Sequence, residues 1–316
     1  MKVKPIFIYF IFLAILCAGF VAGARMMGRQ GMYLAGGYML TPALAAFITR
    51  LFFHHLHFQD ANLRFGRFRD YIRFWLYSLG LAVLTVGLFT LFGAIRWDFS
   101  GTIFLGLLEQ QFAAAGDDMA GSLPPGFTPR MMLWFFFLGG LTVFNILPGL
   151  ITGFGEEFGH RGFMFPNLFP NRPWLGLVLG GFIWYLWHQP LALIFPPGPA
   201  APPWQTMLTY TAGIIGTVAA HIYFCYIYAK SRSIFVPSVA HIAWNNAAGA
   251  FAYFFVVQSQ LAATLVQSLI MVPVVVLLYY SRELDVVFEF LSGKTNNPAI
   301  SPLQEDLAGP ALHTGH

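Results

Sequence analysis

Two adjacent glutamates begin the part of the sequence that is best equipped for chemistry. Glu156 and Glu157 are followed by Arg161, in a chain that holds only six glutamates. If this segment is helical, Glu157 and Arg161 lie four residues apart in the favourable acid-to-base order and form an ion pair. Glu156 points about 100° away from that pair, so its carboxylate stays available. A charged patch that caps a span at the cytoplasmic surface explains the same residues equally well.

Two later apolar runs also carry polar side chains. His188 lies one helical turn after Trp184, while His241 and Asn245 are four residues apart and therefore share one helix face. Polar and ionisable groups at membrane depth are costly, which makes them functional candidates. A single histidine in such a run is also explained by a hydrogen bond to a neighbouring helix.

Together, Glu156, His188, His241 and Asn245 offer a carboxylate, two imidazoles and a carboxamide. A glutamate in a low-dielectric pocket gains proton affinity and suits a general base, and a histidine beside it can hold and polarise a water. Histidine and asparagine donors can stabilise an oxyanion. These groups can hydrolyse a peptide bond without a covalent intermediate. Glu156 and the two histidines could instead bind a divalent metal, although the zinc motif His-Glu-x-x-His is absent.

The composition indicates which kind of protein positions these residues. Hydrophobic residues make up 57% of the 316 residues and charged residues 9%, against about 25% charged in soluble domains. The mean hydropathy is +0.65. A soluble enzyme and a disordered chain are excluded, and both cysteines lie in apolar runs that do not suggest a disulfide scaffold.

Eight apolar runs approach the length of roughly 20 residues that spans a bilayer as a helix. The sequence therefore predicts an all-α membrane protein, a polytopic bundle of about eight transmembrane helices with an intramembrane polar chamber. The runs are 5–23, 33–53, 74–95, 131–152, 174–195, 206–228, 234–257 and 260–280.

Loop charges predict the orientation. With the N-terminus inside, thirteen of the 17 Lys and Arg residues fall on the inside and four on the outside, which favours two cytoplasmic termini. The net charge of +4 is then explained by cytoplasmic loops, and no nucleic-acid partner is expected. Residues 1–24 also resemble a cleaved signal peptide, which leaves the later topology unchanged.

Three parts are predicted along the chain. Residues 1–130 hold N-terminal transmembrane helices and an external loop, with an interfacial helix near 101–113. Residues 131–282 form a catalytic core in the membrane. Residues 283–316 are rich in Asn, Pro, Ser and Gly and are expected to be a disordered cytoplasmic tail.

The three motifs together resemble one family. Glu-Glu-x-x-x-Arg, aromatic-x-x-x-His and His-x-x-x-Asn, each on its own membrane helix, are similar to the CAAX protease and bacteriocin-processing (CPBP, or Abi) family, which includes the type II CAAX prenyl endopeptidases. The flanks 156–164, 184–191 and 238–241 resemble its bacterial members. The resemblance covers roughly residues 150–250 and implies a bacterial inner (plasma) membrane protein.

The resemblance implies a role for each residue. Glu156 and His188 would activate water, Glu157 and Arg161 would be a structural pair, and His241 and Asn245 would form the oxyanion pocket. Trp184 would support the site, and no cofactor is favoured, with zinc as the alternative. His160 stands where the family usually has an aromatic residue, and we expect it to fill that space.

Placement of the site raises one difficulty. His188 lies about 21 Å along its helix from Trp174 at 1.5 Å per residue, whereas Glu156 follows an apolar run and would lie near the cytoplasmic edge. The two meet only if the Glu-Glu segment sits deeper, with a break near Pro148-Gly149. We expect a chamber that opens to the cytoplasm.

Other polar residues are expected to be structural. The cluster His54-His55-Leu56-His57 is interpreted as an interfacial patch facing anionic lipid, and Asn145 and His221 as interhelical hydrogen-bonding residues. The predicted function is an intramembrane endopeptidase acting on membrane-associated prenylated or leader peptides. The alternatives are a non-catalytic scaffold or bacteriocin-immunity protein on the same fold, and a transporter.

Overall fold

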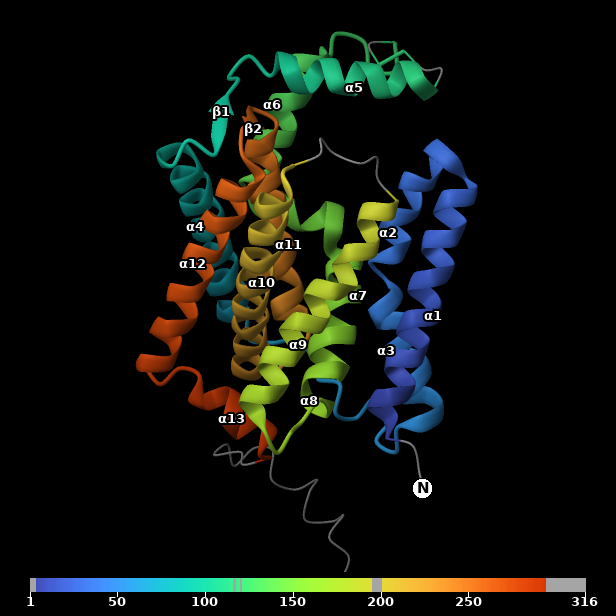
Figure 1. The fold of residues 1–316 in the computed structure, drawn as a ribbon, viewed down its shortest axis with the longest axis vertical. Coiled ribbons are helices and arrows are strands. Elements are labelled where there is room, and N and C mark those ends of the chain that lie inside the picture. Colours follow the sequence, from blue (N-terminus) through green and yellow to red (C-terminus); the bar gives the residue numbers. More distant parts are fainter. Residues whose placement is uncertain (1–3, 116–117, 120, 195–200, 294–316) are drawn as a thin grey trace, which may run out of the picture.

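A computed structural model describes residues 4–115, 118–119, 121–194 and 201–293. These residues are almost entirely helical (Figure 1), which confirms the predicted all-α membrane architecture. The helices are α1 (Pro5–Met26), α2 (Ala35–Tyr38), α3 (Thr41–Phe53), α4 (Phe68–Leu91), α5 (Thr102–Ala115), α6 (Pro129–Gly140), α7 (Leu150–Gly159), α8 (Phe165–Asn167), α9 (Pro173–His188), α10 (Pro203–Ser231), α11 (Phe235–Ala252), α12 (Gln260–Tyr280) and α13 (Asp285–Leu291), with short strands β1 (Ile95–Trp97) and β2 (Phe255–Val257).

Five of the eight predicted spans are long and apolar enough to cross a membrane: α1, the α2–α3 segment, α4, α10 and α12. The other three runs are helical but differ from simple spans. α9 ends after 16 residues at His188, and α11 carries His241, Asn245 and Asn246 along its length. These elements also hold the candidate site residues. Their polar side chains and helix breaks shorten the apolar runs.

The run predicted as one span over 131–152 is broken. α6 ends at Gly140, a 3₁₀ segment follows over Val143–Gly149, and α7 starts at Leu150. The break falls at the expected Pro148-Gly149 position. Beyond it, Glu156 and Glu157 are both buried among the surrounding helices.

Two glycines allow α7 to pack closely on α11. A Cβ atom at Gly149 would lie 2.9 Å from Ile242 Cδ1, and one at Gly153 would clash with the same side chain. α7 therefore brings its backbone against α11 at this face. The next residues, His160–Met164, form a π-turn, a wider helical turn that is often found at functional sites.

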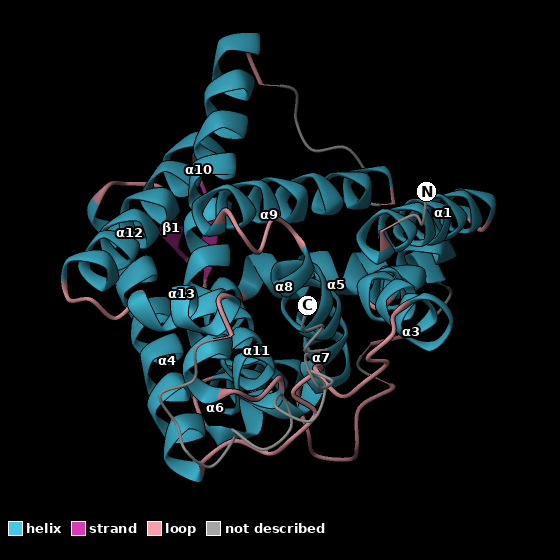
Figure 2. Cartoon of the chain, turned by 90° about the horizontal axis from the view of Figure 1, so that it is seen from below, coloured by secondary structure: helices cyan, strands magenta, loops and turns pink. Residues whose placement is uncertain are grey.

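The ends of the bundle differ. β1 pairs with β2 in an antiparallel ladder, with Ile95 opposite Val257, and α5 lies across this end of the bundle (Figure 1). α5 matches the interfacial helix predicted near 101–113. The opposite end carries the C-termini of α10 and α12, with Lys230, Arg232 and Arg282, and Figure 2 shows the bundle from that side.

The predicted disordered tail is partly helical. α13 buries Leu284 and Val287 and places Phe290 against Phe165 and Tyr228, at ring-centroid distances of 5.8 and 5.2 Å. Leu284, Val287 and Phe290 are spaced so that they pack from one side of this segment and anchor it to α10. The low overall hydrophobicity of the tail did not predict this contact. The rest of the tail, residues 294–316, lies outside the described residues.

Candidate active site

The predicted ion pair is present on α7. Glu157 Oε1 accepts a hydrogen bond from Arg161 Nη1 at 2.9 Å, and both side chains are fully buried. The Arg161 guanidinium also lies over the rings of Trp184 and Phe224, at 4.2 and 5.2 Å from their centroids. Because the guanidinium is held on two sides, it cannot leave Glu157 without a large rearrangement.

His241 on α11 extends this pair into a chain of three residues. Its Nδ1 lies 2.8 Å from Glu157 Oε1. An ionised carboxylate only accepts hydrogen bonds, so Nδ1 carries the proton, and Nε2 is the ring nitrogen left for the adjacent cavity. The bond fixes the ring orientation, as a carboxylate commonly does for a functional histidine.

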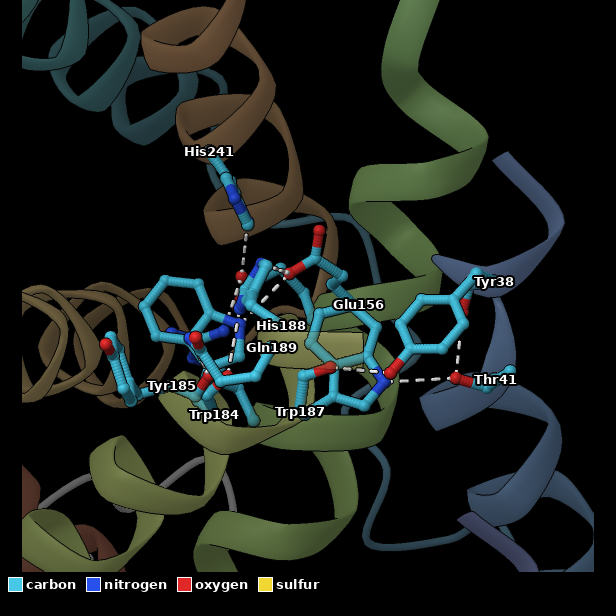
Figure 3. Close-up of polar contacts among 11 residues, drawn as sticks. Tyr38, Thr41, Glu156, Trp184, Tyr185, Trp187, His188, Gln189 and His241 are labelled. Carbon is cyan, nitrogen blue, oxygen red and sulfur yellow. Dashed lines mark hydrogen bonds and ion pairs between the residues drawn. The ribbon is translucent and has the colours of Figure 1, made fainter. Parts of the chain in front are cut away.

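Glu156 lies on the other side of α7 and faces α9 (Figure 3). Its Oε2 accepts a hydrogen bond from Trp184 Nε1 at 3.0 Å and lies 3.8 Å from His188 Nε2. His188 Nδ1 lies 2.9 Å from the backbone carbonyl oxygen of Trp184, an atom that only accepts. Nδ1 therefore carries the proton of the neutral imidazole, and Nε2 presents a lone pair toward Glu156.

Two acceptors thus face each other at a distance too long for a direct hydrogen bond. A contact of this kind is commonly bridged by water. Seen from a water oxygen about 2.8 Å from each atom, the two acceptors lie roughly at a right angle. The water can therefore donate one O–H group to each of them. Its lone pairs then face away from Glu156 and His188.

A cavity of about 430 Å³ adjoins this pair, between α9, α10, α11 and α12. Its wall includes Trp184, His188, His241 and Asn245. Asn245 is solvent-exposed on α11 one turn after His241, as its spacing predicts. The cavity therefore joins the candidate water-binding pair to the candidate oxyanion donors.

The cavity lies in the half of the bundle nearer to the β1–β2 ladder. Thr264, which lines it, is one helical turn from the start of α12, and α12 follows β2 closely in the chain. The basic residues at the ends of α10 and α12 lie at the opposite end of the bundle (Figure 1). With the termini inside, as the loop charges predict, this half of the bundle is the one farther from the cytoplasm. The chamber opening toward the cytoplasm stays a prediction.

A second polar set holds α9 against the N-terminal helices, and the sequence did not reveal it. Tyr38 Oη donates to the backbone oxygen of Trp187 at 2.6 Å, and Trp187 Nε1 donates to Thr41 Oγ1 at 3.1 Å (Figure 3). The rings of Tyr38 and Trp187 stack at 5.4 Å. These contacts fix the last turn of α9, where His188 lies. No motif spacing links residues so distant in sequence.

The remaining candidates take structural positions. His160 is fully buried and packs edge-on against Trp187 at 5.1 Å, which supports its expected space-filling role. Asn145 bridges helices as predicted, since it accepts from Trp75 Nε1 at 3.1 Å and donates to the backbone of Ala243 at 3.3 Å. His221 differs, because its described polar contact is within α10, to Cys225 Sγ at 3.3 Å.

The histidine cluster after α3 is divided: His55 and His57 are exposed, as an interfacial patch requires, whereas His54 is not. His54 is buried edge-on against Phe163. Arg50, also fully buried, contacts Asp60 and donates to the backbone oxygen of Gly162 at 2.6 Å. This arginine ties the loop to the π-turn that follows the glutamates, a role that the basic and histidine-rich composition of the loop did not indicate.

A metal finds no ready-made ligand set among the described residues. They contain no group of three or more His, Cys, Asp or Glu side chains placed to hold an ion. His241 Nδ1 is engaged by Glu157, and Glu156 Oε2 is already engaged by Trp184. His188 Nε2 and His241 Nε2 remain as donor atoms, so a metal held by Glu156, His188 and His241 stays the alternative to a metal-free site.

Replacing Trp184 with phenylalanine tests the hydrogen bond that orients Glu156. The ring that packs on Arg161 is kept, while the N–H donor is lost, so the carboxylate turns more freely. We expect the fold to persist and peptide cleavage to fall about tenfold, the effect of losing one hydrogen bond to a charged group. Initial rates and melting temperatures would check this. Unchanged rates would contradict the orienting role.

Comparison with known proteins agrees with the geometry. Residues 133–247 match the model of a family described as type II CAAX prenyl endopeptidase, Rce1-like. The match contains all three motifs and confirms the predicted family resemblance, over a little more than a third of the chain. This segment is therefore similar to CAAX-type proteases. No curated protein matches the chain.

Proposed function

Because residues 133–247 carry the Rce1-like CAAX prenyl endopeptidase segment, we propose that the protein is an intramembrane endopeptidase that hydrolyses peptide bonds of membrane-associated substrates. One observation carries the proposal: Glu156 Oε2 and His188 Nε2, two acceptors, face each other across 3.8 Å beside a cavity. This arrangement suits a single activated water.

The proposed first step is attack by that water. It donates one hydrogen bond to Glu156 and one to His188, which turns an oxygen lone pair toward the substrate carbonyl carbon. As the C–O bond forms, Glu156 takes the proton. The same proton later reaches the amide nitrogen, the C–N bond breaks, and an amine and a carboxylic acid leave. General base catalysis of this kind contributes about 10²- to 10⁴-fold.

The developing oxyanion is proposed to accept hydrogen bonds from His241 Nε2–H and Asn245 Nδ2–H. For Nε2 to donate, His241 must carry a second proton, and the Glu157 carboxylate at 2.8 Å stabilises that charge. Arg161 Nη1, 2.9 Å from Glu157 Oε1, holds that carboxylate in place. Donors fixed in a water-poor site act strongly on developing charge, because they need no reorganisation during the reaction.

The substrate is proposed to be a membrane-associated peptide, either prenylated or a leader peptide. The site lies within a bundle that carries five apolar spans, so a lipid-anchored or apolar peptide reaches it by lateral diffusion. We place the protein in the bacterial inner (plasma) membrane with both termini in the cytoplasm, as the loop charges favour.

Reconstituted protein tests the proposal directly. The purified chain in liposomes is mixed with a peptide that carries a farnesyl, an acyl or no anchor, and the products are identified by mass spectrometry. Cleavage of one internal bond in an anchored peptide is expected. Peptide binding without cleavage favours a non-catalytic scaffold, and solute flux into the liposomes favours a transporter. Rates after exhaustive chelation separate a metal-dependent enzyme from a glutamic one.

The face from which the cavity is reached can be measured by cysteine labelling. In a background with Cys17 and Cys225 replaced by alanine, Thr264→Cys lines the cavity near the β1–β2 end, and Ser281→Cys lies at the other end of α12. We expect a membrane-impermeant maleimide to label Thr264→Cys in intact cells, and Ser281→Cys only after permeabilisation. The reverse pattern would contradict the proposed orientation.

A further inference from the structure

The cavity extends past the proposed catalytic residues to a helix that the family match does not reach. The match ends at residue 247, whereas α12 covers Gln260–Tyr280. α12 nevertheless forms a whole wall of the cavity. The residues on this wall are Thr264, Gln267, Ser268 and Met271, which follow the i, i+3, i+4, i+7 spacing of one helix face.

This wall is polar on an otherwise apolar helix. Ser268 and Thr264 use their hydroxyls on backbone oxygens, Ser268 on Ala212 at 2.6 Å and Thr264 on Gln260 at 2.9 Å. Gln267 has an exposed side chain, and none of the hydrogen bonds found among the described residues involves its carboxamide. A carboxamide at membrane depth is costly unless its donor and acceptor are both satisfied. Gln267 lines the cavity, so its carboxamide is available to a group bound there.

The facing wall, on α10, has small residues in one part and the Phe224 ring beyond them. Gly213, Gly216 and Thr217 line it. A Cβ atom at Gly216 would lie 2.7 Å from Ser268 Oγ, and one at Gly213 would lie 3.0 Å from the Tyr185 ring. These two glycines therefore let α10 pack closely against α12 and against Tyr185 of α9 at this wall.

The absence of charged residues from the cavity wall restricts what can occupy the cavity. The cavity wall contains no Asp, Glu, Lys or Arg, and its other polar groups are carboxamides, hydroxyls and the two histidines of the site. A carboxamide donates and accepts at once, which matches the N–H and C=O groups of a peptide backbone. A charged side chain would find no counter-ion there.

We propose that the part of the cavity lined by α12 is a substrate subsite for an uncharged polypeptide segment next to the scissile bond, with Gln267 as its specificity-determining residue. This inference rests on the proposed function, since it places the subsite beside the proposed water-binding pair. α12, which lies outside the family segment, then sets the substrate preference of this chain.

Binding and cleavage together test the subsite. The probe is a fluorescent, lipid-anchored peptide in liposomes, made in versions with Asn, Asp or Lys at each position flanking the bond proposed to be cleaved. Affinity is measured in a Glu156→Gln background, where no turnover occurs. Kinetic constants are measured in the active background, so that an effect on KM is separated from one on kcat.

We expect Gln267→Leu to weaken binding of the Asn peptide about tenfold, as the loss of one hydrogen-bonding partner predicts, and to raise KM with little change in kcat. Gln267→Glu should accept Lys and reject Asp at one flanking position. Gln260→Leu, the same change one turn before Thr264 and outside the cavity lining, serves as the matched control and should leave both constants unchanged.

The outcomes separate this inference from the proposed function. If the peptides are cleaved but Gln267→Leu and Gln267→Glu match the wild type in affinity and selectivity, the subsite is overturned and the endopeptidase stands. If binding depends on Gln267 but no peptide is cleaved, the subsite stands and the catalytic proposal fails. Equal effects of Gln260→Leu and Gln267→Leu also overturn the subsite.

Discussion

Glu156→Gln should reduce kcat for peptide cleavage by about 10²- to 10⁴-fold, the range that a general base contributes. Glutamine has nearly the same shape, and its carbonyl oxygen can still accept the hydrogen bond from Trp184 Nε1 that Glu156 Oε2 accepts at 3.0 Å. It cannot take a proton from the water. The structure should therefore be preserved while the chemical step is lost.

Single-turnover cleavage of the lipid-anchored peptide measures this effect without interference from product release. The matched control is Glu109→Gln, the same change at an exposed position on α5, which should retain full activity. Peptide affinity and melting temperature should be unchanged in both variants. A Glu156→Gln protein that keeps more than half of the wild-type rate would show that another group activates the water.

Arg161→Leu should lower the free energy of unfolding by about 3 to 5 kcal/mol, the usual cost of breaking a buried ion pair by removing one partner. Arg161 and Glu157 are both fully buried, so the Glu157 carboxylate would lose its only arginine partner in the bundle core. The packing of the guanidinium on Trp184 would also be lost. Unfolding in mixed detergent micelles, monitored by tryptophan fluorescence, measures the change.

The double variant Glu157→Leu/Arg161→Leu distinguishes a charge effect from a packing effect. Removing both charges of a buried pair is often close to neutral, so we expect this variant to recover most of the stability lost in Arg161→Leu. It should nevertheless remain inactive, because His241 Nδ1 loses the carboxylate that lies 2.8 Å away. If the double variant is as unstable as the single one, packing of the guanidinium outweighs the ion pair.

Residues on one helix were the most predictable part of the site. The ion pair of Glu157 with Arg161 and the shared face of His241 and Asn245 follow from a spacing of four residues. The separation of Glu156 from that pair follows from the same helical period. Such contacts need only a formed helix, so they can be predicted from the sequence without knowledge of the fold.

For contacts between helices, the sequence predicted which residues take part but not which residue contacts which. The sequence placed His188 and His241 together with the glutamates in one set, yet only packing decided that His188 faces Glu156 and His241 binds Glu157. That pairing depends on the close approach of α7 to α11 at Gly149 and Gly153. Glycine residues occur throughout this chain, and their spacing alone does not show which of them lie at a helix contact.

By itself, the sequence determined the membrane character, the helical class and the small set of residues that can do chemistry, because composition and helical periodicity are local properties of the chain. Tertiary structure alone decided the burial of Glu156, the end of the bundle to which the cavity is nearer and the contribution of α12 to its wall. These depend on where the chain breaks between α6 and α7 and on how distant helices pack. Such packing is the sum of many weak contacts between residues far apart in sequence.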